Sequence, residues 1–162
     1  MGRKSSGSVQ RVRDALAAAG VVTEVQELEA STRTAQEAAE AVGCEVAQIV
    51  KSLILKGEAS GTLYLVLASG RNRVCVDSVA ELAGEPVAMA DAVSVRERTG
   101  FAIGGVPPLA HREPLAAIVD EDLISHNVIW AAAGSPSALF RLTPAELLRI
   151  TGGSTARVAT TR

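Results

Sequence analysis

KSLILKGEASGTLYLVLA is the sequence of residues 51–68, and this stretch predicts a β-hairpin. Residues 51–56 carry the consecutive apolar side chains Leu53, Ile54 and Leu55, which favour a strand. Residues 62–68 form a second apolar run, and the glycine-containing segment 57–61 between them suits the turn of a hairpin. We therefore expect two neighbouring antiparallel strands in this part of the chain.

Two helices are predicted upstream of the hairpin from apolar side chains at helical spacing, and each is followed by a glycine. Thr32 or Thr34 is expected to cap the second helix, because Glu37 follows Thr34 at capping-box spacing. Alternating side chains predict a short strand between the two helices, and one more helical turn precedes the hairpin. The four expected elements are residues 9–19, 23–28, 35–42 and 46–50.

Downstream, two helices are predicted to begin at an acidic residue and to end at a glycine. Asp77 is expected to cap residues 78–82, and Asp91 to cap residues 92–98. Thr143 as cap, with Glu146 three residues later, defines a final helix that runs to Ile150. The remaining expected strands are residues 87–89, 116–119, 128–132 and 138–142.

Short strands mixed with helices predict an α+β or mixed α/β fold around a curved sheet. A length of 162 residues is typical of one domain. Hydrophobic residues make up 48% of the chain but aromatics only 2%, so we expect an aliphatic core. The predicted organisation is a loose leader at residues 1–7, one domain at residues 8–151 and a polar, frayed tail at residues 152–162.

The charge and composition argue against several classes of protein. A net charge of -2 and a pI near 5.7 lack the basic excess of dedicated DNA- or RNA-binding proteins, so we expect no DNA partner and only local RNA contacts. Aromatic side chains on which single-stranded bases could stack are scarce. The longest apolar stretches, residues 63–68 and 128–133, fall far short of the roughly 20 residues that span a bilayer. We expect a cytoplasmic protein.

Metal, cofactor and triad chemistry have no support in the sequence. Cys44 and Cys75 lack a second thiol or histidine at ligand spacing, and we expect buried free thiols. His111 and His126 lie outside any zinc-binding motif, although either could still be a general base. The chain also lacks the nucleophile elbow, the phosphate loop and the dinucleotide fingerprint. No metal and no cofactor are expected.

Two features remain as candidates for chemistry. Lys51 enters an apolar strand in a chain with few lysines, and its cation could polarise an ester carbonyl or hold a phosphate, or simply extend into water from a strand end. Gly104 and Gly105 precede a proline pair, Pro107 and Pro108, in a segment that must be a shaped loop. Paired glycines suit a tight turn, but they also let backbone N–H groups approach a carbonyl or oxyanion.

These features occur together with others in a recognisable order. Residues 34–43 carry Thr-Ala with Glu-Ala-Ala and Val-Gly, residues 48–53 read QIVKSL, residues 99–108 combine TGF with IGGVPP, and residues 133–135 read AGS. In this order they resemble the YbaK-like, prolyl-tRNA-synthetase-associated aminoacyl-tRNA editing domain over about residues 20–150. The combination of the QIVKSL strand start with the TGF and GGVPP loop some fifty residues later is the most specific part.

The resemblance implies a single α+β domain, with a mixed, barrel-like curved sheet and peripheral helices, that hydrolyses the ester bond of mischarged tRNA. By position, it implies that Lys51 stabilises the substrate and that Gly104 and Gly105 supply backbone donors to the ester. It also implies that Val106 belongs to the substrate-binding residues and that Gly134 and Ser135 form the opposite wall. Ser135 is equally consistent with a turn residue. Leu109 and Ala110 stand where relatives often have a glycine, so the far edge of the loop is expected to differ in shape.

The leading hypothesis is therefore a free-standing, trans-editing deacylase without a cofactor. Its substrate would be tRNA(Pro) carrying cysteine, alanine or another small amino acid, and the substrate itself would assist hydrolysis because no protein base is evident. Prolyl-tRNA synthetase or an elongation factor is the expected partner in selecting the tRNA. The alternatives are a non-catalytic module that binds tRNA or a synthetase, and a small-molecule binding domain unrelated to tRNA.

Overall fold

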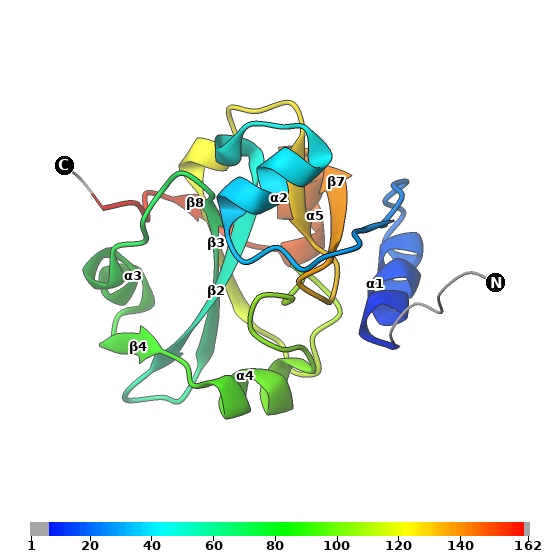
Figure 1. Ribbon diagram of the computed structural model, residues 1–162. Coiled ribbons are helices and arrows are strands. Elements are labelled where there is room, and N and C mark those ends of the chain that lie inside the picture. Colours follow the sequence, from blue (N-terminus) through cyan, green and yellow to red (C-terminus); the bar gives the residue numbers. More distant parts are fainter. Residues whose placement is uncertain (1–6, 161–162) are drawn as a thin grey trace.

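The predicted hairpin lies at the centre of the larger of two sheets in the computed structural model, which describes residues 7–160 (Figure 1). Strands β2 (Val50–Gly57) and β3 (Leu63–Ser69) are antiparallel, with Lys51 opposite Ala68. The sheet order β4-β2-β3-β5-β8 contains both antiparallel and parallel pairs, so the expected mixed sheet is present. The outer strands are β4 (Val87–Met89), β5 (Ala116–Asp120) and β8 (Ser154–Ala156).

The smaller sheet is antiparallel, in the order β1-β7-β6. Its strands are β1 (Gln26–Glu27), β6 (Ile129–Ala132) and β7 (Ala138–Leu142). An isolated parallel bridge between Ile49 and Trp130 brings this sheet against the start of β2, and we call this junction the seam. The described strands thus form two sheets and no closed barrel, so the barrel-like part of the expectation is not confirmed.

Five α-helices within residues 7–160 surround the sheets, and three of them begin with the predicted capping residue. Thr34, Asp91 and Thr143 each accept a hydrogen bond from the backbone N–H three residues later. No helix within residues 7–160 is both long and apolar enough to cross a membrane. The helices are α1 (Gly7–Ala18), α2 (Ala35–Val42), α3 (Val76–Ala83), α4 (Ala92–Thr99) and α5 (Pro144–Thr151), with 3-10 turns η1 (Val46–Gln48) and η2 (Glu121–Leu123).

The two faces of the larger sheet are covered differently. One face packs against the smaller sheet, α1 and α5 in the main core, which includes Val12, Leu65 and Phe140. The other face packs against α3 and the C-terminal segment, where Val79 and Val158 are fully buried. Figure 1 shows α1 and α3 on opposite sides of β2 and β3. Helix α2 covers the seam itself, through Ala38 and Ala39 packed with Ile49, Trp130 and Leu139.

Four local expectations differ from the structure. The segment after residue 151 is not frayed up to residue 160, because β8 pairs with β5 and Val158 fills the second core. The strand expected at residues 23–28 is reduced to β1, which pairs with the end of β7. Helix α3 begins at Val76 with Cys75 as its N-cap, so Asp77 lies in the first turn. Residues 1–6 of the expected leader lie outside the described range, and Gly7 already belongs to α1.

Candidate active site

A cavity of about 580 Å³ opens where the two sheets meet. Val50 and its neighbours on β2 form one wall, and Ala132 and Leu139 of the smaller sheet form another. Ala35 at the start of α2 also lines the cavity, as does Gly104 in the loop at residues 101–108, which we call the glycine loop. We call this space, bounded by Ala35, Val50, Gly104, Ala132 and Leu139, the seam cavity. Its volume lies in the range of roughly 300–1,000 Å³ that is usual for small-molecule sites.

The seam cavity lies beside a stretch of β2 with an open edge. Strand β3 pairs with residues 50–56 of β2, whereas β4 pairs only with residues 55–57. The Ile54 carbonyl accepts a hydrogen bond from the Ala90 N–H at 3.0 Å, so its main-chain groups point toward the edge away from β3. Main-chain groups of alternate residues in an antiparallel strand share an edge. The N–H and C=O of Ser52 therefore point to the same edge, at the cavity.

Lys51 lines the seam cavity together with Gly104, so the structure brings the two principal predicted features to one site. The Lys51 side chain is half-buried, and its ammonium group donates a hydrogen bond to the Asn72 carbonyl. Burial lowers the pKa of Lys51 below its ordinary value, the negative charge of Asp120 opposes this shift, and the positive charge of Arg73 adds to it. The ammonium is thus held by the backbone of Asn72, a residue that sequence reasoning did not single out.

A buried carboxylate holds the loop that receives this ammonium. Asp120 is 1% exposed, and its Oδ2 accepts hydrogen bonds from the Ser69 N–H at 3.0 Å and from the Asn72 amide nitrogen at 2.8 Å. The same amide nitrogen donates to Asp122 at 2.7 Å. Because Asn72 is fixed from two sides, its carbonyl is a preorganised acceptor for Lys51. Parallel pairing of β3 with β5 brings Asp120 to this loop, and no local sequence signal could have shown it.

Ser52 is a second residue that sequence reasoning missed. Its hydroxyl is buried and has no hydrogen-bond partner among residues 7–160, and the residue lines the seam cavity. A buried hydroxyl without a partner costs about 1–3 kcal/mol, so such a group is expected to have a role that offsets the cost. Ser52 thus lies at the cavity wall with an unpaired hydroxyl oxygen that is buried just behind it.

The glycine loop divides between the cavity and the core. Gly104 has a φ of +91° and lines the cavity together with Val106. Gly105 does not line it, because it is buried against Ser135, where an added Cβ would lie 2.7 Å from the Ser135 Cα. The Gly105 N–H donates to the Ala102 carbonyl at 3.0 Å and is therefore occupied within the turn. The Gly105 N–H is thus used within the turn in this structure, and a substrate contact by Gly105 stays a prediction.

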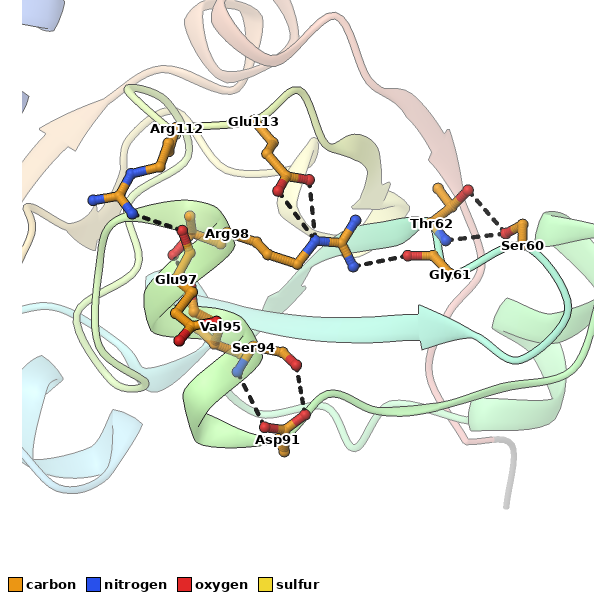
Figure 2. Close-up of polar contacts among 11 residues, drawn as sticks. Ser60, Gly61, Thr62, Asp91, Ser94, Val95, Glu97, Arg98, Arg112 and Glu113 are labelled. Atoms are coloured by element: carbon orange, nitrogen blue, oxygen red, sulfur yellow. Dashed lines mark hydrogen bonds and ion pairs between the residues drawn. The ribbon is translucent and has the colours of Figure 1, made fainter.

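Contacts from the residues that flank the glycine loop hold it in place. Figure 2 shows Arg98 of α4 between the Glu113 carboxylate, at 3.0 Å, and the Gly61 carbonyl of the hairpin turn, at 2.8 Å. Just after the loop, Nε2 of His111 lies 2.6 Å from the Pro107 carbonyl oxygen, and the His111 ring packs edge-on against Phe101. Burial lowers the pKa of His111 below its ordinary value. His111 therefore supports the loop from behind, and neither histidine lines the seam cavity.

The structure places Gly134 and Ser135 away from the cavity lining. Gly134 is buried against α1, and a Cβ added there would lie 2.6 Å from the Ser8 carbonyl oxygen. The Ser135 hydroxyl accepts a hydrogen bond from the Ser137 N–H at 3.1 Å, as a turn residue does. The opposite wall is built by Ala132 and Leu139, which flank this turn. A substrate contact by Gly134 or Ser135 stays a prediction.

The described lining of the seam cavity contains cations and hydroxyls but no carboxylate, histidine or cysteine. Residues 7–160 also contain no group of three or more potential metal ligands. Cys44 and Cys75 are free thiols and are only partly buried, in contrast to the expectation. The arrangement can bind and polarise a ligand carbonyl with the Lys51 ammonium, the Ser52 hydroxyl and backbone groups. It offers no protein base from its own walls.

Comparison with known proteins gives consistent results. The sequence model of the aminoacyl-tRNA editing domain matches residues 29–150. "Uncharacterized protein YwhH" of Bacillus subtilis (strain 168) is 32% identical over 124 residues, which cover 76% of this chain and 78% of that protein. "Putative Cys-tRNA(Pro)/Cys-tRNA(Cys) deacylase EbsC" of Enterococcus faecalis (strain ATCC 700802 / V583) is 25% identical over 128 residues, 78% and 77% of the two chains. "Crystal structure of a putative trans-editing enzyme for prolyl tRNA synthetase" describes a fold with a TM-score of 0.92 and 52% identity, over 98% of this chain and 100% of that one.

Proposed function

This chain belongs to the aminoacyl-tRNA editing domain family, and we propose that it hydrolyses, in trans, the ester bond of a mischarged tRNA. The observation that carries the proposal is the seam cavity, whose wall combines the Lys51 cation, the unpaired Ser52 hydroxyl and Gly104. A cation and hydrogen-bond donors around one small space suit an ester carbonyl whose oxygen becomes negative during hydrolysis.

In the proposed reaction, water attacks the ester carbonyl carbon, the bond to the ribose oxygen breaks, and that oxygen takes up a proton as the amino acid leaves. Lys51 stabilises the oxyanion, and Ser52 and the backbone at Gly104 orient the ester. The walls supply no carboxylate or imidazole, so a hydroxyl of the terminal ribose of the substrate activates the water. Positioning and charge stabilisation then provide most of the rate enhancement.

We propose a small amino acid as the part of the substrate that is recognised, with alanine and cysteine on tRNA(Pro) as the first candidates. The pocket walls at Val106, Ala132 and Leu139 are apolar. An apolar pocket separates side chains that differ by one methylene by only about 1–3 kcal/mol, which is why synthetases that confuse small amino acids need a second hydrolytic site. The name of the relative EbsC supports cysteine on tRNA(Pro), and that of the trans-editing neighbour supports a link with prolyl-tRNA synthetase.

The test is a deacylation screen of the purified protein against a panel of mischarged tRNAs, with substrate in excess. We expect release of a small amino acid, loss of turnover in Lys51→Ala, and an unchanged circular dichroism spectrum for that variant. Unchanged turnover in Lys51→Ala would remove Lys51 from the mechanism. Tight binding of mischarged tRNA without any release of amino acid would replace the proposal by a non-catalytic binding module.

A further inference from the structure

A groove of about 400 Å³ adjoins the seam cavity. The two spaces share Lys51, Leu53 and Gly70 in their linings, so they meet along β2 and the turn that follows β3. Beyond these shared residues, Arg71 and Arg73 line one part of the groove. We call this space the arginine groove.

The two arginines are free to bind a ligand. Both side chains are exposed, and neither guanidinium group has a hydrogen-bond or ion-pair partner among residues 7–160. Elsewhere Arg98 is paired with a glutamate, and Arg112 donates to a backbone carbonyl. The charge of Arg73 reaches the shared rim, since it contributes to the lowered pKa of Lys51. Positive charge is therefore concentrated beside the cavity in a chain with a net charge of -2.

The backbone that carries these arginines is fixed. The side chain of Asn72, which lies between them, is bound to Asp120 and Asp122 at 2.8 Å and 2.7 Å. The Arg73 carbonyl accepts a hydrogen bond from the Thr160 N–H at 2.7 Å. Met89 and Val76 also line the groove and add exposed apolar surface, with 57% and 39% of each residue exposed. Two guanidinium groups carried on a fixed backbone, in a groove that also has apolar lining, suit a nucleotide, because guanidinium groups pair with phosphate oxygens and a base can lie on apolar side chains.

We propose that the arginine groove binds the phosphodiester backbone of the single-stranded RNA end that leads into the seam cavity. This inference rests on the proposed function, because an ester at the end of an RNA chain in the seam cavity requires the preceding phosphates to lie close by. Arg71 and Arg73 hold the chain by charge, and Met89 and Val76 contact a base. The contact would supply the local RNA affinity that the acidic composition otherwise lacks.

The test compares two substrates that carry the same amino acid, mischarged tRNA and an aminoacyl ester of adenosine without phosphate. For Arg71→Ala/Arg73→Ala, we expect kcat/KM on the tRNA to fall about tenfold. We expect kcat/KM on the adenosine ester to change by less than about twofold, because only the loss of the Arg73 charge beside Lys51 acts on both substrates. The slope of log(kcat/KM) on tRNA against log(salt concentration) should become shallower by about 0.7 per lost phosphate contact. Arg71→Lys/Arg73→Lys should keep most activity, and Arg96→Ala, an exposed arginine of α4, is the matched control.

An equal loss on both substrates, or no loss on tRNA, would overturn the inference. If the wild-type protein hydrolyses neither substrate, the proposed function fails, and the groove is then tested by binding a labelled single-stranded oligoribonucleotide with the sequence of the tRNA 3′ end. Binding that the double alanine variant loses would support the groove as an RNA site. If the wild-type protein does not bind that probe, the groove is not an RNA site. If adenosine monophosphate competes as well as the oligoribonucleotide, the groove is a small-anion site and the inference is overturned.

Discussion

Replacing Asp120 by alanine is expected to destabilise the protein by about 3 kcal/mol, mainly through one orphaned donor. Asp120 accepts hydrogen bonds from the Ser69 N–H at 3.0 Å, from the Asn72 side chain at 2.8 Å and from the Asp122 N–H at 3.0 Å. Ser69 is fully buried, so its N–H has no access to water once the carboxylate is gone, which costs about 1–3 kcal/mol. Asn72 and Asp122 are only partly buried or exposed, and water can replace much of what they lose.

The measurement is equilibrium urea unfolding followed by the fluorescence of Trp130, the only tryptophan and 7% exposed. Asp122→Ala is the matched control, because Asp122 binds the same Asn72 side chain from an exposed position. We expect that control to change the free energy of unfolding by about 0.5 kcal/mol or less. A free energy for Asp120→Ala equal to that of the control would refute the assignment of the buried carboxylate as the support of this loop.

A second substitution at Asp120, Asp120→Asn, tests the link between this carboxylate and Lys51. The charge of Asp120 raises the pKa of Lys51 against the effect of burial, so its removal should lower the Lys51 pKa further. If hydrolysis requires the protonated ammonium, the fall in kcat/KM at alkaline pH should move to lower pH in Asp120→Asn. The isosteric asparagine keeps one acceptor oxygen and limits the structural change. A pH profile identical to that of the wild type would show that Asp120 does not act through Lys51.

Three further outcomes follow from the structure. Gly105→Ala should lower the melting temperature more than Gly104→Ala, because a Cβ at Gly105 would lie 2.7 Å from the Ser135 backbone, a clash of about 1–3 kcal/mol. A Cβ at Gly104 would meet only Pro136, at 3.6 Å, and would add backbone strain of about 1–2 kcal/mol. Equal melting temperatures for the two variants would contradict this. Burial lowers the pKa of His111, so the unfolded chain binds a proton more readily, and the free energy of unfolding should fall as the pH drops below about 6.5. In urea unfolding, this fall should be smaller for His111→Gln than for the wild type, with His126→Gln as the control. A fall in His111→Gln as large as in the wild type would contradict the prediction. Lys51→Met should be at least as stable as the wild type at pH 7, because it removes a partly desolvated ammonium group. A decrease of more than about 1 kcal/mol in the free energy of urea unfolding would instead show that the Lys51 contact to Asn72 stabilises the fold.

Much of the local structure could be predicted from the sequence because its determinants are close together along the chain. The hairpin depends on two apolar runs around a glycine-containing turn, and both strands pair as expected. The caps at Thr34, Asp91 and Thr143 each join a side chain to a backbone N–H three residues away, which is a contact that spacing alone reveals. Lys51 and the glycine loop could be recognised for a similar reason, since unusual residues in an apolar strand and a GGVPP loop stand out within a few positions.

The tertiary structure decided which of these residues share a surface. Parallel pairing of β3 with β5 and of β5 with β8 joins segments far apart in sequence, brings Asp120 to Asn72, and orders a polar segment that looks like a tail. Gly105 and Gly134 turn to the core because Ser135 and α1 pass them at close range. Packing of distant segments also places Ser52 at the seam cavity and Arg71 at the arginine groove. Hydrophobic periodicity records that a side chain is buried but not which segment covers it, so contacts between distant segments are settled only when all the apolar faces pack together.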